Sequence, residues 1–379
     1  MRKLVAAVAV VAVSVPAAAA VSQRHAPPAR YLLTDLGAVA GAARSSAATG
    51  VDKRGDVIGW LQGFGGAQDA VLWRNRRAIM LDPDAGESRA ADVNDRGQVV
   101  GDSFRVQPPG RYAWIWDDGR LTRLGTLGGN VTEAVAINNR GRVIGNGLTA
   151  SGLTHAFSWS GGKMTDLGTL GGDTASAVAV NERGQVAGWS QTATGAQHAF
   201  LWQNGAMRDL GTIGHLNSQP VAIGDRGDVV GFAHPSFLDP THAVLWRNGR
   251  LVDLGSFAAP TKEAVGIDAR GRVLVQAFGP RRAFLWRNGD RIRVGPTLAA
   301  VSAINRRGQV IGRAPVGRIA QAPFVWQNGS LTPLPNLDGV GPPFGSGAAL
   351  NDRGQIVGSS YTDVGRHTVL HAVLWTPRR

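Results

Sequence analysis

Histidine and aspartate recur at two fixed places in this sequence, and together they suggest a general base held by a carboxylate. The pairs in neighbouring segments are His155 with Asp166, His198 with Asp209, and His242 with Asp253, while His371 and Asp35 remain near the two ends of the chain. Four such dyads could be catalytic. Because one enzyme site rarely recurs in four copies, we interpret the pairs as hydrogen bonds that brace neighbouring strands.

A second fixed place, directly after an apolar run, carries side chains of changing type. The column holds Trp60, Asp102, Asn146, Trp189, Phe232, Gln276, Arg313 and Ser359. Its aromatic members could stack on a sugar ring or a peptide, although packing between repeat units would also explain them. We select Trp60, Trp189, Phe232 and Arg313 as candidate ligand-binding residues.

Further charged candidates belong to the first short strand of the repeat, some at its start and one within it. Arg89, Glu133 and Glu263 share one repeat position, and Asp92 interrupts a column that otherwise holds glycine and alanine. An unpaired buried carboxylate is unfavourable, so we expect Asp92 to pair with Arg89 or to bind a cation. Glu133 and Glu263 could be the paired carboxylates of an enzyme that cleaves polysaccharides, but they stand three repeats apart.

An arginine precedes the glycine of every recurring turn, and such a set could bind a polyanion. Acidic residues in the same turns offset much of this charge, so solvated turn arginines are the alternative. The arginines are Arg54, Arg96, Arg140, Arg183, Arg226, Arg270, Arg307 and Arg353. The sequence contains no motif for a phosphate loop, a zinc or calcium site, or a nucleophile elbow.

The elements that must position these residues are short strands in a repeat of about 43 residues. Each repeat contains an Asn/Asp-x-x-Gly turn, as at Asn138 to Gly141, and four strand-like segments separated by glycine turns. This pattern predicts an all-β fold, an eight-bladed β-propeller of four-stranded antiparallel blades. The glycine/alanine column is expected on the innermost strand, where blades crowd around the axis.

The two ends of the repeat region predict how the ring closes. Residues 31–37 read as a fourth strand with no blade before it, and residues 371–375 read as a third strand with no fourth after it. Pairing the two would complete the last blade and remove exposed sheet edges. It would also bring Asp35 to His371. Seven blades with one unit left unpaired is the alternative.

The N-terminal sequence predicts that the chain is exported from the cell. Arg2 and Lys3, an apolar run and Ala18-Ala19-Ala20 predict a signal peptide over residues 1–20, followed by a linker over 21–30 and one propeller domain over 31–379. The alternative is an uncleaved membrane anchor. The chain has no cysteine, so it forms no disulfide, and its formal charge is +13 from 40 basic and 27 acidic residues.

The unit His-Ala-Phe-x-Trp-x-x-Gly-x-Met-x-Asp-Leu-Gly-x-Leu-Gly-Gly resembles the extracellular HAF repeat. Two copies are nearly complete, from His155 to Gly172 and from His198 to Gly214, and other copies lose the histidine. The resemblance covers residues 31 to about 375 and implies a secreted repeat protein of β-propeller type. It implies no catalytic residues.

These observations favour a secreted, non-enzymatic propeller that binds a glycan, an anionic polymer, an envelope component or a protein. The alternatives are a polysaccharide hydrolase or lyase with its site at the mouth of the axis, and a purely structural protein. We expect no cofactor and no metal. We also expect no specific nucleic acid, no transmembrane span after signal cleavage, and a monomer.

Overall fold

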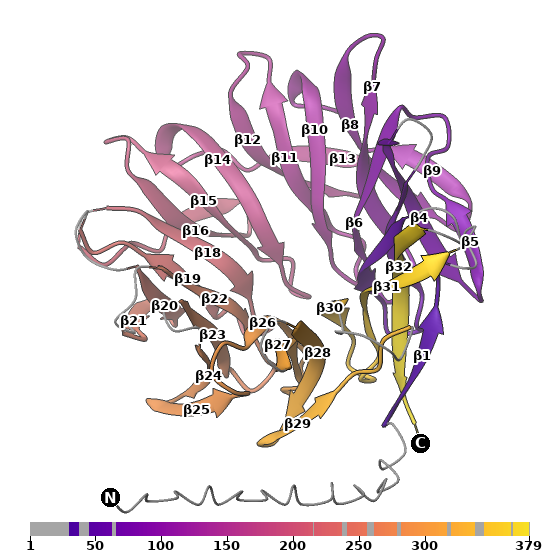
Figure 1. Cartoon of the computed structure of the whole chain (residues 1–379). Helices are drawn as coiled ribbons and strands as arrows, with labels where there is room; N and C mark the ends of the chain where they lie inside the picture. The colour runs from indigo at the N-terminus through magenta and orange to yellow at the C-terminus, as the bar shows by residue number, and fades with distance from the viewer. Residues whose placement is uncertain are drawn as a thin grey trace, which may run out of the picture.

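The computed structural model describes residues 30–37, 45–62, 66–214, 216–236, 241–255, 261–278, 282–316, 320–337, 345–364 and 367–378. The regular elements within these ranges are all β-strands (Figure 1). The predicted signal peptide and all of the predicted linker except Arg30 lie outside the described residues, so both stay predictions. No described residue belongs to a helix that is long and apolar enough to cross a membrane.

The strands follow one another in sets of four, and we call each set a blade. The first strands are β2 (Ser46–Val51), β6 (Glu87–Val93), β10 (Gly128–Ile137), β14 (Gly171–Val180), β18 (Ser218–Ile223), β22 (Thr261–Ile267), β26 (Ala300–Ile304) and β30 (Gly345–Leu350). The second strands are β3 (Val57–Gln62), β7 (Val99–Arg105), β11 (Val143–Thr149), β15 (Val186–Thr192), β19 (Val229–Ala233), β23 (Val273–Phe278), β27 (Val310–Val316) and β31 (Ile356–Val364). The third strands are β4 (Gln68–Arg74), β8 (Gly110–Asp117), β12 (Thr154–Ser160), β16 (Gln197–Gln203), β20 (His242–Arg247), β24 (Arg282–Arg287), β28 (Ala320–Gln327) and β32 (His367–Pro377). The outermost strands are β5 (Arg77–Met80), β9 (Arg120–Arg123), β13 (Lys163–Asp166), β17 (Ala206–Asp209), β21 (Arg250–Asp253), β25 (Asp290–Val294), β29 (Ser330–Pro333) and β1 (Tyr31–Asp35).

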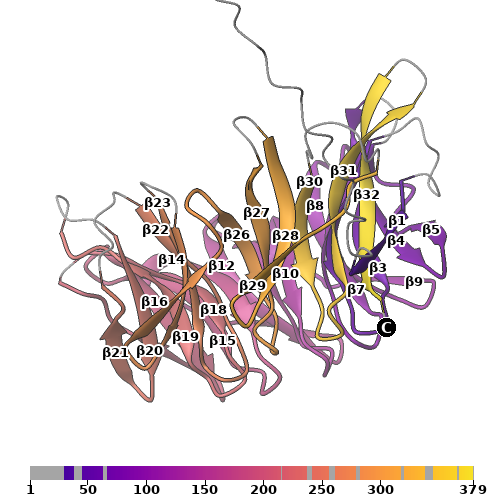
Figure 2. The ribbon, with the colours of Figure 1, turned by 60° about the horizontal axis from the view of Figure 1, so that its bottom comes forward.

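Hydrogen bonding organises these sets into antiparallel sheets around a common axis. Blade 1 is β2–β5, and numbering continues along the chain to blade 7, β26–β29; β30, β31, β32 and β1 form the closing blade. Blades 2 and 3 share one eight-stranded sheet because Val131 on β10 pairs in parallel with Arg111 on β8. First strands contact the first strands of neighbouring blades, so they are innermost (Figures 1 and 2). The predicted all-β propeller of four-stranded antiparallel blades is the observed fold.

The ring closes through pairing of the two ends of the described chain. β1 pairs antiparallel with β32, with Leu33 opposite Trp375. Next to this pair, the Ala372 amide donates to Ser46 Oγ on blade 1 at 3.0 Å. The Asn351 side-chain amide reaches across the same junction to the Asp52 carbonyl at 2.7 Å. The terminal strand β1 therefore covers the edge that β32 would otherwise expose.

The Asn-x-x-Gly turns hold their own geometry and also link neighbouring blades. Asn138 Oδ1 accepts hydrogen bonds from the backbone amides of Arg140 and Arg142, both at 3.0 Å. This Asx-type bonding explains the residue preference. The Asn138 Nδ2 atom donates to the Asn181 carbonyl of the next blade at 2.9 Å. Asn94, Asn181, Asn305 and Asn351 make the equivalent bond to the following blade.

A bulge on every first strand sets the register of the inner mouth. In blade 2, pairing with β7 shifts between Ala90 and Asp92. Opposite the bulge stands Gly101, where an added Cβ would collide with the Arg89 carbonyl and the Trp114 ring. Only glycine permits this close approach of the two strands. The residue after that glycine is the one that the sequence places in the variable column.

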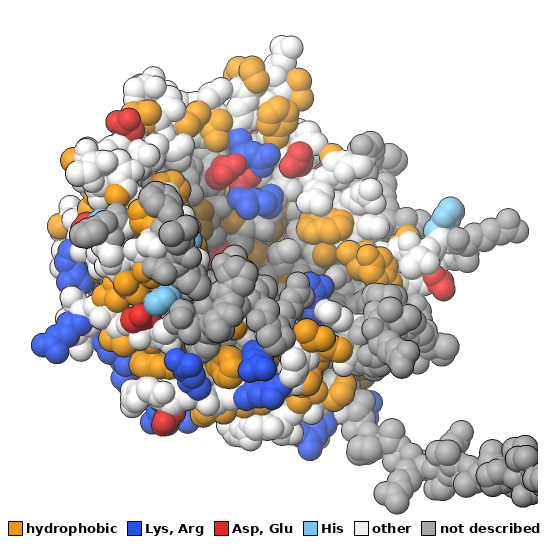
Figure 3. Space-filling model, turned by 60° about the vertical axis from the view of Figure 1, so that its left-hand side comes forward, with side chains coloured by type: hydrophobic (Ala, Val, Ile, Leu, Met, Phe, Trp, Pro, Cys, Tyr) orange, Lys and Arg blue, Asp and Glu red, His pale blue; other side chains and the backbone are white. Residues whose placement is uncertain are grey.

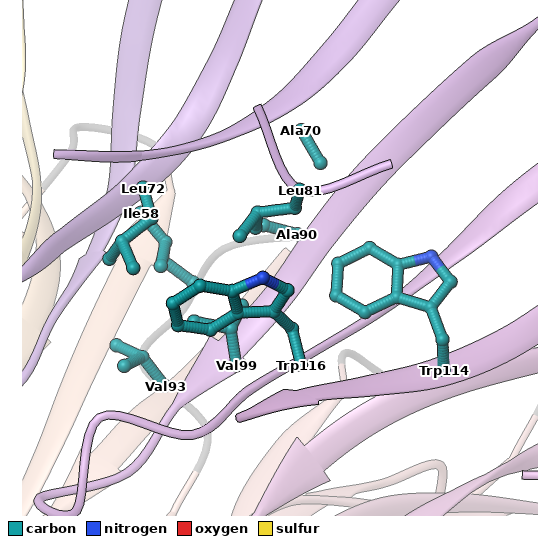
Figure 4. Packing of buried hydrophobic residues seen from close by; sticks show 9 residues of the cluster. All are labelled: Ile58, Ala70, Leu72, Leu81, Ala90, Val93, Val99, Trp114 and Trp116. Atoms are coloured by element: carbon teal, nitrogen blue, oxygen red, sulfur yellow. The ribbon is translucent and has the colours of Figure 1, made fainter. Parts of the chain in front are cut away.

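The core consists of layers between blades and has no single centre. In one cluster Ile58, Ala70 and Leu72 of blade 1 pack against Val93 and Trp114 of blade 2 (Figure 4). Comparable clusters lie between other neighbouring pairs. Because each blade buries its faces on its neighbours, stability depends on the ring as a whole.

Candidate functional site

The first-strand candidates and the variable-column candidates are cross-strand neighbours. They lie at the end of the blades opposite the Asn-x-x-Gly turns. Arg89 pairs with Asp102, Glu133 with Asn146, and Gln219 with Phe232. Each mouth residue on a first strand therefore stands beside a variable residue on the second strand. Figure 3 shows one face of the molecule, hollowed near its centre, with basic and acidic side chains gathered along the hollow.

A cavity of about 330 Å³ joins two of the predicted residues, Trp60 of blade 1 and Arg89 of blade 2. We call it the Trp60 cavity. Its remaining lining comes from small or polar residues of blades 1 to 3, which are Thr49, Gly59, Gln68, Ala90, Ala91, Ala134 and Val135. The indole is partly exposed, so an aromatic surface and a cation face one space that solvent can enter.

A buried carboxylate holds Arg89 at this cavity. Asp102 is fully buried, and it accepts hydrogen bonds from Arg89 Nε at 3.1 Å and from Nη2 at 2.7 Å. Arg111 donates to the other Asp102 oxygen at 2.5 Å. The Arg89 Nη1 atom has no hydrogen-bond partner among the described residues, so it is available to a ligand. Two cations on one carboxylate offset the cost of burying it.

Arg111 extends the network to the predicted residue Glu133. The Arg111 Nε atom lies 3.5 Å from Glu133 Oε1, and Nη2 lies 3.6 Å from Glu87 Oε1. Burial opposes the Arg111 charge, but the Asp102 hydrogen bond and the charges of Asp102, Glu133 and Glu87 outweigh it, so its pKa is raised above the ordinary value. Glu133 therefore stands as a partner of an arginine and not as a free acid.

Neighbouring hydrogen bonds fix the strands that carry this network. Tyr112 and Ser103 both donate to Asp82 Oδ2 at 2.8 Å, and the Trp114 indole donates to Ser103 Oγ at 2.8 Å. Burial first, and then the hydrogen bond to Asp82, raises the pKa of the Tyr112 phenol. Arg111 and Asp102 adjoin Tyr112 and Ser103 in sequence, so their backbone is held on both strands.

The predicted pairing of Asp92 with Arg89 is wrong. Asp92 lies beyond the bulge, toward the turn end of the axis, and Arg89 reaches Asp102 instead. Asp92 accepts backbone hydrogen bonds from Val93 at 2.8 Å and Ile137 at 2.9 Å. Burial raises the pKa of Asp92, and the two backbone hydrogen bonds lower it by a smaller amount. The resulting pKa is about 6. It lines an axial cavity of about 350 Å³. Among the described residues, no group of acidic or histidine side chains could hold a metal ion.

The remaining candidates occupy the same column on other blades and do not join the Trp60 cavity. Trp189 and Phe232 are partly buried, and Phe232 meets His234 edge to face with ring centroids 5.9 Å apart. Arg313 is exposed. The Glu263 side chain lies outside the described residues, so its pairing with Glu133 stays a prediction. The structure thus assembles Trp60, Arg89 and Glu133 in one region.

The four histidine–aspartate contacts that the repeat comparison predicts are present. The Nδ1 atoms of His155 and His198 lie 2.8 Å from their aspartates, that of His242 lies 2.9 Å, and that of His371 lies 3.0 Å from Asp35. The first three rings have no other hydrogen-bond partner among the described residues, so no hydroxyl nucleophile stands at Nε2. They act as braces between third and outermost strands.

Sequence reasoning missed three residues of the site. Asp102 stood in the variable column and was an ionisable residue in an apolar strand, which was the available signal. Arg111 stands near the start of β8, five residues before Trp116, at a repeat position where the side-chain type changes from blade to blade. Gln68 begins β4 at the same repeat position, five residues before Trp73. Repeat comparison finds residues that recur, and these do not.

Comparison with known proteins supports the fold. No protein-family model and no curated protein sequence matches the chain. An acylaminoacyl peptidase solved with Z-Gly-Gly-Phe-chloromethyl ketone is 9% identical, with TM-score 0.52, over 85% of this chain and 59% of that chain. The β-propeller domain of the Trilobed protease from Pyrococcus furiosus is 10% identical, with TM-score 0.53, over 79% and 98%. A puromycin-hydrolyzing peptidase of Mycobacterium tuberculosis is 13% identical, with TM-score 0.50, over 86% and 60%.

These comparisons correct the predicted function. The propellers that this chain resembles belong to peptidases, so the interpretation as a non-enzymatic binding module is wrong. None of the three proteins is named for action on a polysaccharide, which was the alternative. The chain spans about 60% of the length of two of these peptidases, so the likeness covers their propeller fold and says nothing of the rest.

Proposed function

We propose that this chain is the propeller part of a peptide-hydrolysing system and that the Trp60 cavity receives the peptide. The proposal is based on one observation: Trp60 and Arg89 both line the same cavity. The peptidase likeness of the fold is consistent with it. We place the bond-cleaving groups on a catalytic unit apart from the propeller, since the matched peptidases extend well beyond the part that this chain covers.

The cavity has the chemistry of a peptide end with an apolar or aromatic side chain. An aromatic ring stacked on Trp60 would contribute about 0.5–1.5 kcal/mol beyond its burial. A carboxylate or carbonyl could accept from Arg89 Nη1, and hydrogen bonds to a charged group contribute about 1.5–3 kcal/mol. The Asp102 carboxylate keeps the guanidinium in place, so little side-chain entropy is lost when the ligand binds.

The proposal is tested by titrating the full chain with peptides that end in phenylalanine. We expect a peptide with a free C-terminal carboxylate to bind more tightly than its amide, and Trp60→Ala to weaken binding about tenfold. Trp189→Ala is the matched control, because Trp189 holds the same column position on blade 4 and lies outside the cavity. Equal losses in both variants would refute the assignment.

Participation in hydrolysis needs a separate measurement. The wild-type chain and Trp60→Ala are each added to a secreted extract of the source cells depleted of this chain, and peptide cleavage is followed by mass spectrometry. We expect wild type to raise the cleavage rate of the peptides that it binds, and Trp60→Ala to raise it less. Tight binding with no effect on cleavage would leave the cavity assignment standing and overturn the link to hydrolysis.

A further inference from the structure

A cleft of about 700 Å³ lies on the turn side of the ring, between blade 7 and the closing blade. Four arginines line it, which are Arg30, Arg307, Arg353 and Arg378, and its lining includes no acidic side chain. All four are exposed, and none forms an ion pair among the described residues. Like charges gathered without a counter-charge repel one another, so an anion in the cleft would stabilise the arrangement.

Ring closure creates this cleft. In blades 1 to 7 a hairpin turn joins the third and outermost strands, such as the turn at Asn248 and Gly249 in blade 5. The closing blade takes these strands from opposite ends of the chain, so it has no such turn. The two ends meet there instead, with the Arg378 amide donating to the Arg30 carbonyl at 2.9 Å. Two of the four arginines are therefore placed by closure itself.

The equivalent cleft between blades 4 and 5 differs from this one because it carries an acidic side chain. That cleft has a volume of about 520 Å³ and includes Arg208, Arg226 and Asp228. Asp228 forms an ion pair with Arg247 at 2.9 Å, and on blade 1 Asp56 forms the matching pair with Arg74 at 2.8 Å.

At the closing junction neutral side chains occupy these positions. Gln309 on blade 7 donates to Gln327 at 3.2 Å, and Gln355 on the closing blade stands where blade 5 has Asp228. The residue after the turn glycine is aspartate only in blades 1 and 5, as Asp56 and Asp228, and in neither blade beside this cleft. No acidic side chain lines the cleft, so the four guanidinium groups have no counter-charge in the described part of the chain.

We propose that this cleft binds an acidic peptide segment. Guanidinium groups match carboxylates with paired hydrogen bonds, and four of them suit a segment with several acidic residues. The rest of the lining suits peptide chemistry: Gln327, Asn328 and Ser330 can bond to backbone amides, while Tyr31 and Pro377 offer apolar surface to side-chain methylenes. A compact phosphate needs neither. The segment binds on the side of the ring away from the Trp60 cavity.

The test uses the full chain and calorimetric titration with end-capped hexaglutamate, with hexaglutamine as the neutral control. We expect hexaglutamate to bind and hexaglutamine not to bind, with affinity falling as salt rises. Arg353→Gln combined with Arg378→Gln should weaken hexaglutamate about tenfold or more. Arg226→Gln, the same turn position in the cleft between blades 4 and 5, should change it less than twofold. All three arginines are exposed, so the variants should fold, and circular dichroism checks that they do.

Three outcomes would overturn the proposal. Absence of hexaglutamate binding rejects an anionic peptide as the ligand. An equal loss with Arg226→Gln rejects the location and indicates general attraction to a basic surface. Binding of inorganic tripolyphosphate more tightly than hexaglutamate rejects the peptide and indicates a phosphate site. None of these results bears on the Trp60 cavity, so the two proposals fail separately.

Discussion

Replacing Asp92 with asparagine should change how the stability of this protein depends on pH. The folded pKa of Asp92 is about 6, against an ordinary value of 3.8. One pKa unit corresponds to about 1.4 kcal/mol, so the shift amounts to about 3 kcal/mol. Because the folded state holds this proton more tightly, the contribution of Asp92 to the unfolding free energy is greatest below pH 3.8. That contribution falls as pH rises from 3.8 to about 6 and is lost above that pH.

Asparagine does not titrate, so Asp92→Asn should lack this fall. The variant also keeps only one acceptor oxygen for the Val93 and Ile137 amides, which costs about 1–3 kcal/mol at every pH. We therefore expect the variant to be less stable than wild type near pH 4 and to equal or exceed it by pH 7. The difference between the two proteins should change by about 3 kcal/mol over this interval.

Urea unfolding of both proteins at a series of pH values between 4 and 8 measures this difference directly. Other carboxylates and the histidines titrate in both proteins, so their contributions cancel in the comparison. A carbon-detected NMR titration of the Asp92 carboxyl gives its pKa independently. Parallel stability curves, or an NMR pKa near the ordinary aspartate value, would refute the reasoning that burial raises this pKa.

Three further predictions concern the scaffold. Gly101→Ala should lower the unfolding free energy by about 1–3 kcal/mol, because its Cβ would collide with the bulged strand. Gly86→Ala should be neutral in the same urea series, because its Cβ would meet its nearest neighbours only at an ordinary contact distance of 3.9 Å. Asp102→Ala should cost about 1–3 kcal/mol. This is less than for a fully buried pair, since Arg89 and Arg111 reach solvent, and an unchanged midpoint would contradict the bridging role. His371→Ala should destabilise more than His155→Ala in thermal unfolding, because only 2% of the His371 side chain is exposed and it spans the closure, while 19% of the His155 side chain is exposed. Equal shifts in Tm would argue against a special role for the closing blade.

Much of the fold could be predicted from local sequence because the same turn and strand residues recur in each repeat. The Asn-x-x-Gly turns need a side-chain acceptor and a residue with positive φ, and Gly141 adopts φ of 80°. The closing strand was predictable because Asp35 was the remaining partner for His371. Each feature would be a weak indication in a single segment, but its recurrence made the place of each strand in the ring predictable.

The site was only partly predictable because it is where the repeat breaks down. The sequence indicated Trp60, Arg89 and Glu133 as candidates but paired Arg89 with the wrong carboxylate. The bulge between Ala90 and Asp92 separates residues that look adjacent on one strand, and the sequence interpretation did not include it. Arg111 stands on β8 at a position where the repeat fixes no side-chain type, so its contact with Asp102 could not be inferred from recurrence.

Photo-crosslinking gives the most direct test of where peptide binds. A peptide with a C-terminal benzoylphenylalanine is bound to the full chain, irradiated, digested and mapped by mass spectrometry. We predict crosslinks on the fragments that carry Trp60 and Arg89, lost on addition of excess unlabelled peptide. Crosslinks confined to the turn side of the ring, or crosslinks that survive competition, would contradict the account.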